Sequence, residues 1–361
     1  MKLRYSPLLS VRPNPQTTRE DQLILSDAWS GKRFLVQREA LGDVLLFLHG
    51  KKLGEDSRIN NVQEKLESAG ILGSELTTEE KAHIRHWWNR GWHPSLEYYL
   101  WSRRVFYADI EDSHGEIRYN AIKRYLADGS PPPRIAPRGE SLPLEPVDLP
   151  SAALLGSLLV KRRTVRRYLL GEVPQSRLSG TLWWGLHRIR ELRKVPRQDP
   201  TDYLLSHGVA FDFYVIVYAV RGVSPGIYFY DLKNHSLVQV RRGDVRKSMY
   251  NIIFKTPAIL SANWTILIVA DVLQYQWLYR HERALRNLYI EAGRVGQRLI
   301  LTALAYGQGS LTTPAFRDKQ LSKLLDLEPV RQVPIYSITA GSLHREQQEP
   351  PETGREYERD S

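Results

Sequence analysis

The stretch KRRTVRRYLL, residues 161–170, places five cations within its first seven positions. If residues 158–170 form a helix, Arg162 and Arg166 lie one turn apart on the same face. Two guanidiniums at that spacing can grip a phosphate or the polar edge of a planar ring, because arginine presents its donors as a rigid fork. The run could instead bind nucleic acid or form a solvated basic face. Its composition leaves all three interpretations open.

The overall composition limits the classes of ligand or partner that such a run could bind. The 361 residues carry a formal net charge of +11, which favours an anionic ligand or partner. Basic and acidic residues are interleaved along the chain, so we expect no nucleic-acid partner. The absence of cysteine excludes a disulfide scaffold, a thiolate metal site and a cysteine nucleophile, and we expect no metal. No apolar stretch approaches the roughly 20 residues of a membrane span, and the polar N-terminus does not resemble a signal peptide. We therefore expect a cytoplasmic protein that contacts no membrane.

Changes in composition predict the domain boundaries. Residues 128–150 contain seven prolines, three of them consecutive, and predict an extended, semi-rigid linker. Residues 1–127 combine short helical patterns with a strand, KRFLVQ. They predict a small winged-helix-like domain, which could bind DNA or a peptide beside its strand. Residues 151–345 predict the main domain, and the polar stretch 346–361 predicts a disordered tail.

The main domain has an α+β pattern that must position the basic run. Residues 211–220 predict a strand, and residues 263–272 are a nearly continuous apolar run of the kind that forms a strand buried on both faces. The turn GVSPG after the first run predicts a hairpin. A long helix is predicted over 282–307, and a last strand over 332–341, from the periodicity of their apolar residues.

Four stretches of this domain, in order, resemble a known family. KRRTVRRY, followed by the helix opening RLSGTLWWGL, resembles the R-R-S-x-R-x-F opening of the nitroreductase fold, whose members bind FMN. The hairpin GVSPGIYFY and the helix YIEAGRVGQRLILTALAYGQG resemble those of SagB-type dehydrogenases, which are azoline oxidases. TTPAFRDKQLSKLLDL with PIYSITAG resembles the C-terminal part of the same proteins. The resemblance covers residues 155–345. It implies an α+β, nitroreductase-like FMN-binding fold, a central mostly antiparallel sheet flanked by helices, built as a homodimer.

The resemblance also implies a role for the basic run. Arg162 or Arg163, together with Arg166, would contact the phosphate, ribityl chain and pyrimidine edge of FMN, where an arginine stabilises the charge that develops on reduction. Backbone N–H groups near Thr312 and Thr313 would meet N5 and O4 of the ring. The other residues that it places at the cofactor are Arg345, for the phosphate, and Ser206 and Gly208, whose alternative interpretation is plain turn chemistry.

SagB-type chemistry needs a base for the acidic α-proton and a hydride acceptor beside it. In the family a Lys-Tyr pair, in a K-Y-G-x-R-x-x-R stretch before the EAG helix, is associated with that proton transfer. Here the stretch is YRHERALR, with Tyr279 at the Lys position and Arg280 at the Tyr position. Tyr279 could be the base, with its pKa lowered by Arg280, or His281 or Glu282 could serve. Alternatively the chain has lost this oxidation, or these residues form an ordinary first turn of a helix.

The sequence thus predicts an FMN-dependent dehydrogenase that oxidises thiazoline or oxazoline rings to thiazole or oxazole in a ribosomally made or carrier-bound peptide. The N-terminal domain is expected to capture a leader peptide by strand addition. A cyclodehydratase or another peptide-modifying enzyme is an expected partner. Two alternatives stay open: an NAD(P)H-dependent nitro- or quinone-reductase, and a flavin-fold scaffold for partner enzymes.

Overall fold

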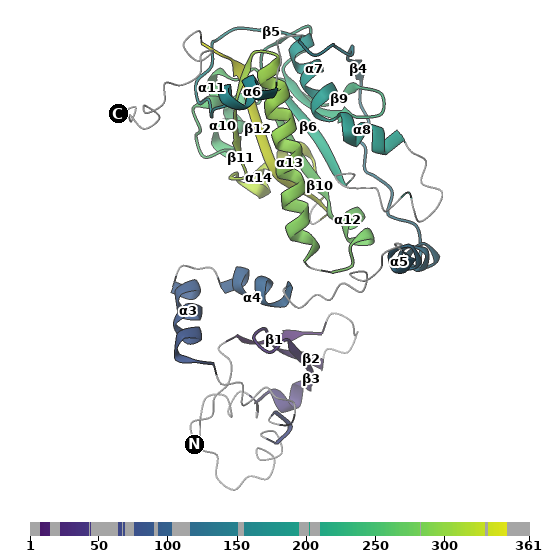
Figure 1. The fold of residues 1–361 in the computed structure, drawn as a ribbon, viewed down its shortest axis with the longest axis vertical. Helices are drawn as coiled ribbons and strands as arrows, with labels where there is room; N and C mark the ends of the chain where they lie inside the picture. The colour runs from purple at the N-terminus through teal and green to yellow at the C-terminus, as the bar shows by residue number, and fades with distance from the viewer. Residues whose placement is uncertain are drawn as a thin grey trace. The chain divides into compact units, whose positions relative to one another are not determined.

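The computed structural model contains two compact units (Figure 1). The first comprises Met1–Tyr107 with His281–Arg283, and the second comprises Ala108–Arg280 with Ala284–Ser361. The structure describes residues 8–14, 22–42, 44, 64–66, 68, 76–89, 93–102, 116–150, 155–194, 202, 210–281, 283–328 and 331–344. No helix in these ranges is both long and apolar enough to cross a membrane.

The first unit combines a small antiparallel sheet with helices. Its elements are β1 (Leu9–Pro13), β2 (Gln22–Asp27), β3 (Lys32–Gln37), the 3-10 helix η1 (Arg38–Ala40), α3 (Thr78–Asn89) and α4 (His93–Ser102). The sheet has the order β1-β2-β3, and β3 is the strand KRFLVQ predicted from the sequence. Thr77 and Glu80 exchange hydrogen bonds, Thr77 N to Glu80 Oε2 at 2.7 Å and Glu80 N to Thr77 Oγ1 at 3.1 Å. This capping box begins α3.

The second unit is built on a seven-stranded sheet in which every neighbouring pair is antiparallel. Its strands are β4 (Ser141–Pro143), β6 (Phe211–Val217), β8 (Gly226–Asp231), β9 (Ser236–Arg242), β10 (Trp264–Asp271), β11 (Gln308–Thr313) and β12 (Gln332–Ser342). They lie in the order β11-β12-β10-β6-β8-β9-β4, so β11 is one edge of the sheet. A separate parallel pair joins β5 (Val173–Pro174) to β7 (Val220–Arg221).

Helices cover both faces of this sheet (Figure 1). One face carries α7 (Gln175–Gly185) and α13 (Ala284–Ala305), and the other carries α10 (Arg246–Ile252), α11 (Ala258–Ser261) and α14 (Asp318–Leu325). Strand β6 shows why both faces are buried: Phe213 and Val215 join one core, while Tyr214 and Ile216 join the other, because side chains alternate along a strand. The predicted α+β arrangement, with a small domain before it, is confirmed.

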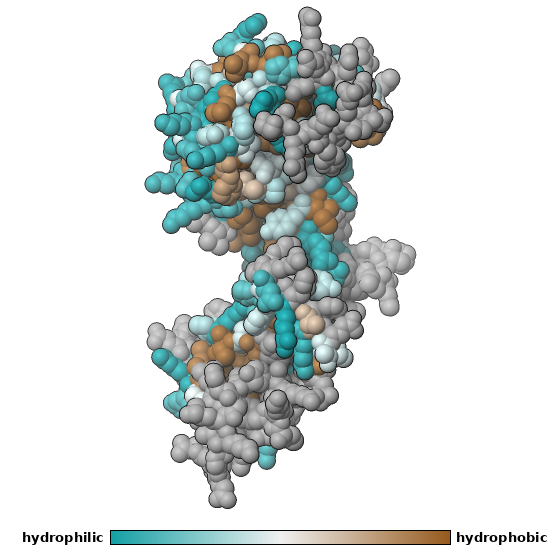
Figure 2. Space-filling model, turned by 90° about the vertical axis from the view of Figure 1, so that its left-hand side faces the viewer, coloured by the Kyte–Doolittle hydropathy of each residue, from teal (hydrophilic) through white to brown (hydrophobic). Residues whose placement is uncertain are grey.

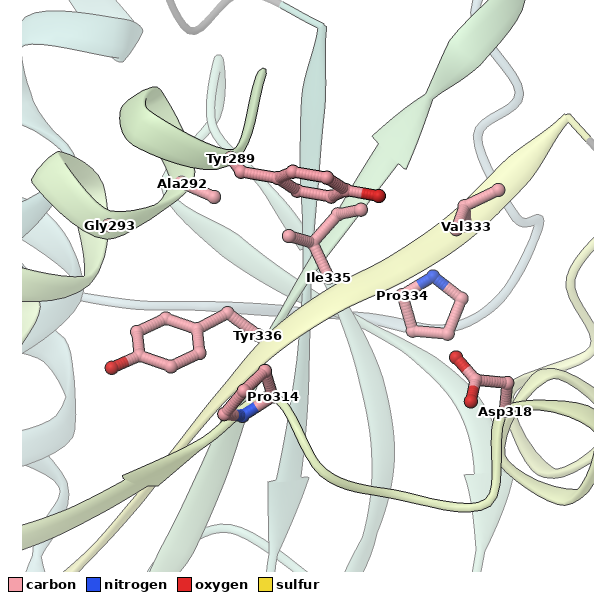
Figure 3. Close-up of a pocket in the computed structure, with 9 residues that line it drawn as sticks. All are labelled: Tyr289, Ala292, Gly293, Pro314, Asp318, Val333, Pro334, Ile335 and Tyr336. Carbon is pink, nitrogen blue, oxygen red and sulfur yellow. The ribbon is translucent and has the colours of Figure 1, made fainter. Parts of the chain in front are cut away.

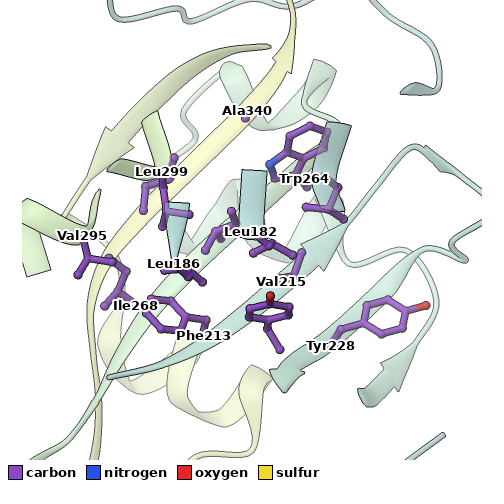
Figure 4. Packing of buried hydrophobic residues seen from close by; sticks show 14 of the residues in the cluster. Leu182, Leu186, Phe213, Val215, Tyr228, Trp264, Ile268, Val295, Leu299 and Ala340 are labelled. Atoms are coloured by element: carbon purple, nitrogen blue, oxygen red, sulfur yellow. The ribbon is translucent and has the colours of Figure 1, made fainter. Parts of the chain in front are cut away.

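The core between the sheet and the helices α7 and α13 is closely packed (Figure 4). Leu182 of α7, Leu186 at the end of that helix and Leu299 of α13 meet Phe213 and Trp264 of the sheet. All five side chains are fully buried, and each such burial stabilises the fold by about 1.5–3 kcal/mol. This core fixes α13 against the sheet, and with it the cavity described below.

The proline-rich stretch 128–150 belongs to the second unit. Arg134 forms an ion pair with Asp212 at 3.0 Å, and the carboxylate is 2% exposed. Residues 141–143 form β4 beside β9. The stretch follows α5 (Glu116–Ala127), which packs against α12 (Val272–Leu278). The predicted linker is thus ordered along the sheet, whereas the predicted tail 346–361 lies outside the described residues. The helices α6 (Leu155–Lys161) and α8 (His187–Lys194) complete the unit.

Candidate functional site

The basic run, Lys161–Arg167, is an extended segment at the edge of the sheet. Helix α6 ends at Lys161, and beyond it Val165 N donates to Ser310 O of β11 at 3.0 Å. A helix over 158–170 is therefore wrong beyond Lys161, so the arginines are not paired by helical spacing. They are instead displayed along an extended chain beside β11.

Close packing explains this extended conformation. Val165 and Tyr168 are buried, and Tyr168 OH donates to Thr339 O at 2.9 Å. Glycines admit both side chains: an added Cβ at Gly309 would lie 2.8 Å from Val165 Cγ2, and one at Gly341 would overlap the Tyr168 ring. Packing onto the strands thus outweighs the helix propensity of the run.

Three arginines of the run remain available to a ligand. Arg162, Arg166 and Arg167 are exposed, and Arg163 is half-buried. Across the described ranges, none of the three exposed arginines forms an ion pair, although other arginines do so repeatedly. Guanidiniums without a protein carboxylate suit an anion such as phosphate.

Strand β11 leads away from the basic run. Ser310 accepts its hydrogen bond from Val165 on the outer edge of the strand. Because backbone groups of alternate residues share one edge of a strand, the N–H of Thr312 lies on the same outer edge, and no other described strand pairs there. Thr313 pairs with Ser337 of β12. From Ser310 to Pro314 the chain spans about 13 Å.

A cavity of about 490 Å³ lies beyond the end of β11 (Figure 3). We call it the α13–β12 cavity; its lining is Tyr289, Ala292 and Gly293 of α13, Pro314, Asp318, and Val333, Pro334, Ile335 and Tyr336 of β12. Figure 3 shows the Tyr289 ring and Ile335 facing each other across it. Asp318 is the one carboxylate among these residues. Apolar and aromatic walls with few polar groups are typical of a small-molecule site.

Small residues on α13 make room for this cavity. An added Cβ at Gly293 would meet no atom within 4 Å, whereas one at Gly296 would lie 2.7 Å from the Tyr336 ring. Ala292 is buried at the floor. The EAG stretch singled out in the sequence therefore forms one wall of the cavity.

The predicted catalytic residues Tyr279 and Arg280 lie in a contact between α12 and α5. The Tyr279 ring lies 4.7 Å from that of Tyr275, and the Arg118 guanidinium is 5.3 Å from the Tyr279 centroid. Arg280 stacks on Tyr125 at 3.8 Å and pairs with Asp128 at 3.3 Å. Burial raises the pKa of Tyr279, and Arg118 offsets this only in part. The expected lowering of that pKa by Arg280 is therefore wrong, because Arg280 is engaged with α5.

The other predicted site residues are placed differently. Thr312 and Thr313 occupy the end of β11, as expected. His281 belongs to the first unit. Ser206, Gly208 and Arg345 lie outside the described residues. In the part of the chain that is described, no group of three or more His, Asp or Glu side chains could hold a metal ion.

A buried polar network in the second unit joins a serine to a histidine, as a hydrolytic triad does, but has a tyrosine in the place of the carboxylate. His235 Nε2 lies 3.0 Å from Ser179 Oγ, and its Nδ1 lies 2.5 Å from Tyr230 OH. Burial, with Arg190 nearby, lowers the pKa of His235 to about 4. Ser179 and His235 are 1% and 4% exposed, so no substrate reaches them. The network ties the β8–β9 hairpin to α7.

Sequence reasoning missed several residues of this region. Tyr289, Tyr336 and Asp318 line the cavity, and Arg118 contacts Tyr279. Tyr289 and Gly293 are spaced by four positions on α13, a signal that could have paired them on one face. No local signal predicts Arg118, since it meets Tyr279 from a helix about 160 positions away.

Comparisons with known proteins agree with this geometry. A family model described as "Nitroreductase family" matches residues 159–342, which include the basic run, β11 and the cavity. The trifolitoxin operon protein TfxC of Rhizobium leguminosarum bv. trifolii is 27% identical over 291 residues, covering 77% of this chain and 80% of that protein.

Two further proteins are similar to part of this chain. A candidate nitroreductase of Methanocaldococcus jannaschii is 28% identical over 185 residues, 50% of this chain and 89% of that protein. A solved structure of a candidate nitroreductase from Anabaena variabilis has a TM-score of 0.49 and 20% identity over 62% of this chain. The match covers 47% of that protein, so this chain spans about half its length.

Proposed function

Because this chain belongs to the nitroreductase family, we propose that it is an FMN-dependent oxidoreductase that oxidises thiazoline or oxazoline rings to thiazole or oxazole in a ribosomally made or carrier-bound peptide. TfxC is a protein of the trifolitoxin operon, which supports a role in making a natural product. A match over 77% of this chain is longer than the second unit, so the likeness reaches into the first unit. We propose that the first unit recognises the peptide, by strand addition.

One observation carries this proposal: β11 leads from a cluster of cations to a cavity with apolar walls. Arg162 and Arg166 would hold the phosphate of FMN, because these two arginines form no ion pair within the described ranges, and Arg163 would lie beside them. The outward N–H of Thr312 would meet the polar edge of the ring. Bound FMN would supply the hydride acceptor. Arg345, Ser206 and Gly208 are further proposed contacts.

The azoline ring is proposed to lie in the α13–β12 cavity. Tyr289 offers an aromatic face to a flat ring. Asp318 is the carboxylate among the lining residues, and we propose that it accepts the α-proton while the electron pair of the neighbouring C–H bond leaves as hydride. Tyr279 ranks second to Asp318 as the base, because its raised pKa keeps the phenol protonated at neutral pH, where it cannot accept a proton.

We propose that the protein acts as a homodimer, together with a cyclodehydratase or another peptide-modifying enzyme. Helix α6 has no buried residue and exposes Leu155, Leu159 and Val160, while α13 exposes Tyr289 and Ile290. Figure 2 shows apolar patches among hydrophilic side chains on the larger unit. Exposed apolar patches of this kind mark interaction surfaces.

Flavin spectroscopy tests the proposal. The purified chain should take up FMN, and an azoline-containing peptide should bleach the flavin absorbance anaerobically, with the oxidised ring seen by mass spectrometry. A chain that takes up no FMN contradicts the proposal. Bleaching by NADPH and not by the peptide would favour a nitro- or quinone-reductase. A chain that binds FMN but carries out neither reaction would favour the remaining alternative, a flavin-fold scaffold for partner enzymes. The Tyr279-Arg280 pair, which stands where the family has Lys-Tyr, is the feature that favours this alternative.

A further inference from the structure

Gln308, the first residue of β11, has a buried side-chain amide whose oxygen meets no hydrogen-bond donor among the described residues. The side chain is fully buried, and its Nε2 donates to Gly307 O at 3.3 Å. Its Oε1 accepts no hydrogen bond from any described residue. Leaving a buried carbonyl oxygen unsatisfied destabilises a protein, so a buried glutamine in this position calls for a partner.

The surroundings of Gln308 indicate what that partner is. Gln308 lines a very small cavity, about 10 Å³, together with Arg162 and Arg163, and this is close to the volume that one water needs. Ile300, Leu304 and Leu343 form its apolar part and offer no side-chain donor. Lys161 and Ser310 also line it, but Lys161 is exposed and the Ser310 hydroxyl is both donor and acceptor. Guanidinium groups are donors only and an amide oxygen is an acceptor only, so the two are complementary.

We infer that Gln308 Oε1 positions the Arg163 guanidinium, directly or through one water, in the orientation that binds the phosphate of FMN. Arg163 is chosen because it is half-buried, whereas Arg162 is exposed. A guanidinium held by a buried acceptor loses less rotational freedom when the phosphate binds. Gln308 is thus a positioning residue that touches no ligand, and the inference rests on the proposed binding of FMN by the basic run.

Two properties of Gln308→Leu separate this role from a purely structural one. The variant exchanges a buried amide for an apolar side chain of similar size, and the half-buried Arg163 can bond to water instead, so the melting temperature of the FMN-free protein should change little. If Gln308 positions Arg163, the dissociation constant of FMN, measured by fluorescence titration, should nevertheless increase about ten-fold. Gln308→Met keeps the length of the side chain without the acceptor and should behave alike. Gln320→Leu, at an exposed position of α14, is the control and should bind FMN as the wild type does.

A double-mutant cycle with Arg163→Ala completes the test. In the Arg163→Ala background, Gln308→Leu should change the FMN dissociation constant less than twofold, because coupled residues are not additive. Unchanged FMN affinity in Gln308→Leu and Gln308→Met, or the same loss in both backgrounds, would overturn the inference. If the wild type binds no FMN, the proposed function fails as well, so the two failures are told apart by the wild-type titration.

Discussion

Replacing Gly341 with alanine tests how the basic run is held on the sheet. A Cβ at this position of β12 would overlap the Tyr168 ring. Tyr168 is 3% exposed and its hydroxyl donates to Thr339 O at 2.9 Å, so the ring has no free space to enter. Either the ring or the strand must move, and the run moves with Tyr168.

The size of the effect follows from three contributions. Overpacking a buried site costs about 1–3 kcal/mol, and losing the Tyr168 hydrogen bond adds about 1 kcal/mol. Gly341 does not have a positive φ, so alanine restricts the unfolded chain and offsets about 0.5 kcal/mol. We expect the free energy of unfolding to fall by about 1.5–3.5 kcal/mol. FMN affinity should fall too, because Arg162, Arg163 and Arg166 are displaced.

Urea unfolding followed by tryptophan fluorescence, together with FMN titration, measures both effects. Gly156→Ala on α6 is the control, since an added Cβ there meets no atom within 4 Å, and it should be neutral or slightly stabilising. Tyr168→Leu removes the ring, so its combination with Gly341→Ala should be less than additive. If Gly341→Ala unfolds at the wild-type urea concentration, the packing argument for the extended run is refuted.

Three further predictions concern the cavity, the α5 contact and pH. Asp318→Asn should lower kcat for azoline oxidation at least about 100-fold at unchanged FMN affinity, and should cost about 0.5 kcal/mol of stability at the N-terminus of α14. The kcat of Tyr279→Phe should stay within about threefold of the wild-type value. The opposite ranking of the two variants in steady-state kinetics would assign proton transfer to Tyr279. Arg280→Ala removes the stacking on Tyr125 and the solvent-screened pair with Asp128. Denaturant unfolding should therefore show a free energy of unfolding lower by about 0.5–1 kcal/mol. An unchanged free energy would mean that this contact does not stabilise the fold. The pKa of His235 is lowered to about 4 in the folded protein, so the unfolded chain binds the proton more readily. The contribution of His235 to the free energy of unfolding should be complete above about pH 6.5 and should fall by about 3 kcal/mol as the pH drops to 4. His235→Asn, which tolerates the left-handed backbone of φ 48°, should flatten this dependence, and an equally steep pH profile in the variant would contradict the assignment.

Local patterns predicted the framework well. Strands β6 and β10 were predicted because each is a run of apolar and aromatic residues, and burial on both faces was expected for β10. Helix α13, expected over 282–307, spans Ala284–Ala305, because its apolar residues repeat with the helical period. The basic run and the cavity wall on α13 were singled out for the types and order of their residues. These features depend on neighbours within a few turns or one strand.

The sequence by itself determined where the cations lie along the chain, which strands are apolar on both faces and where the long helix begins and ends. Only the tertiary structure decided that the run is extended, that β11 leads from it to the α13–β12 cavity, and that Arg280 stacks on Tyr125 of α5. The physical reason is the range of the contacts. Tyr168 bonds to a residue 171 positions away, and Arg280 pairs with one 152 positions away. Such contacts override local propensity, and no local pattern encodes them.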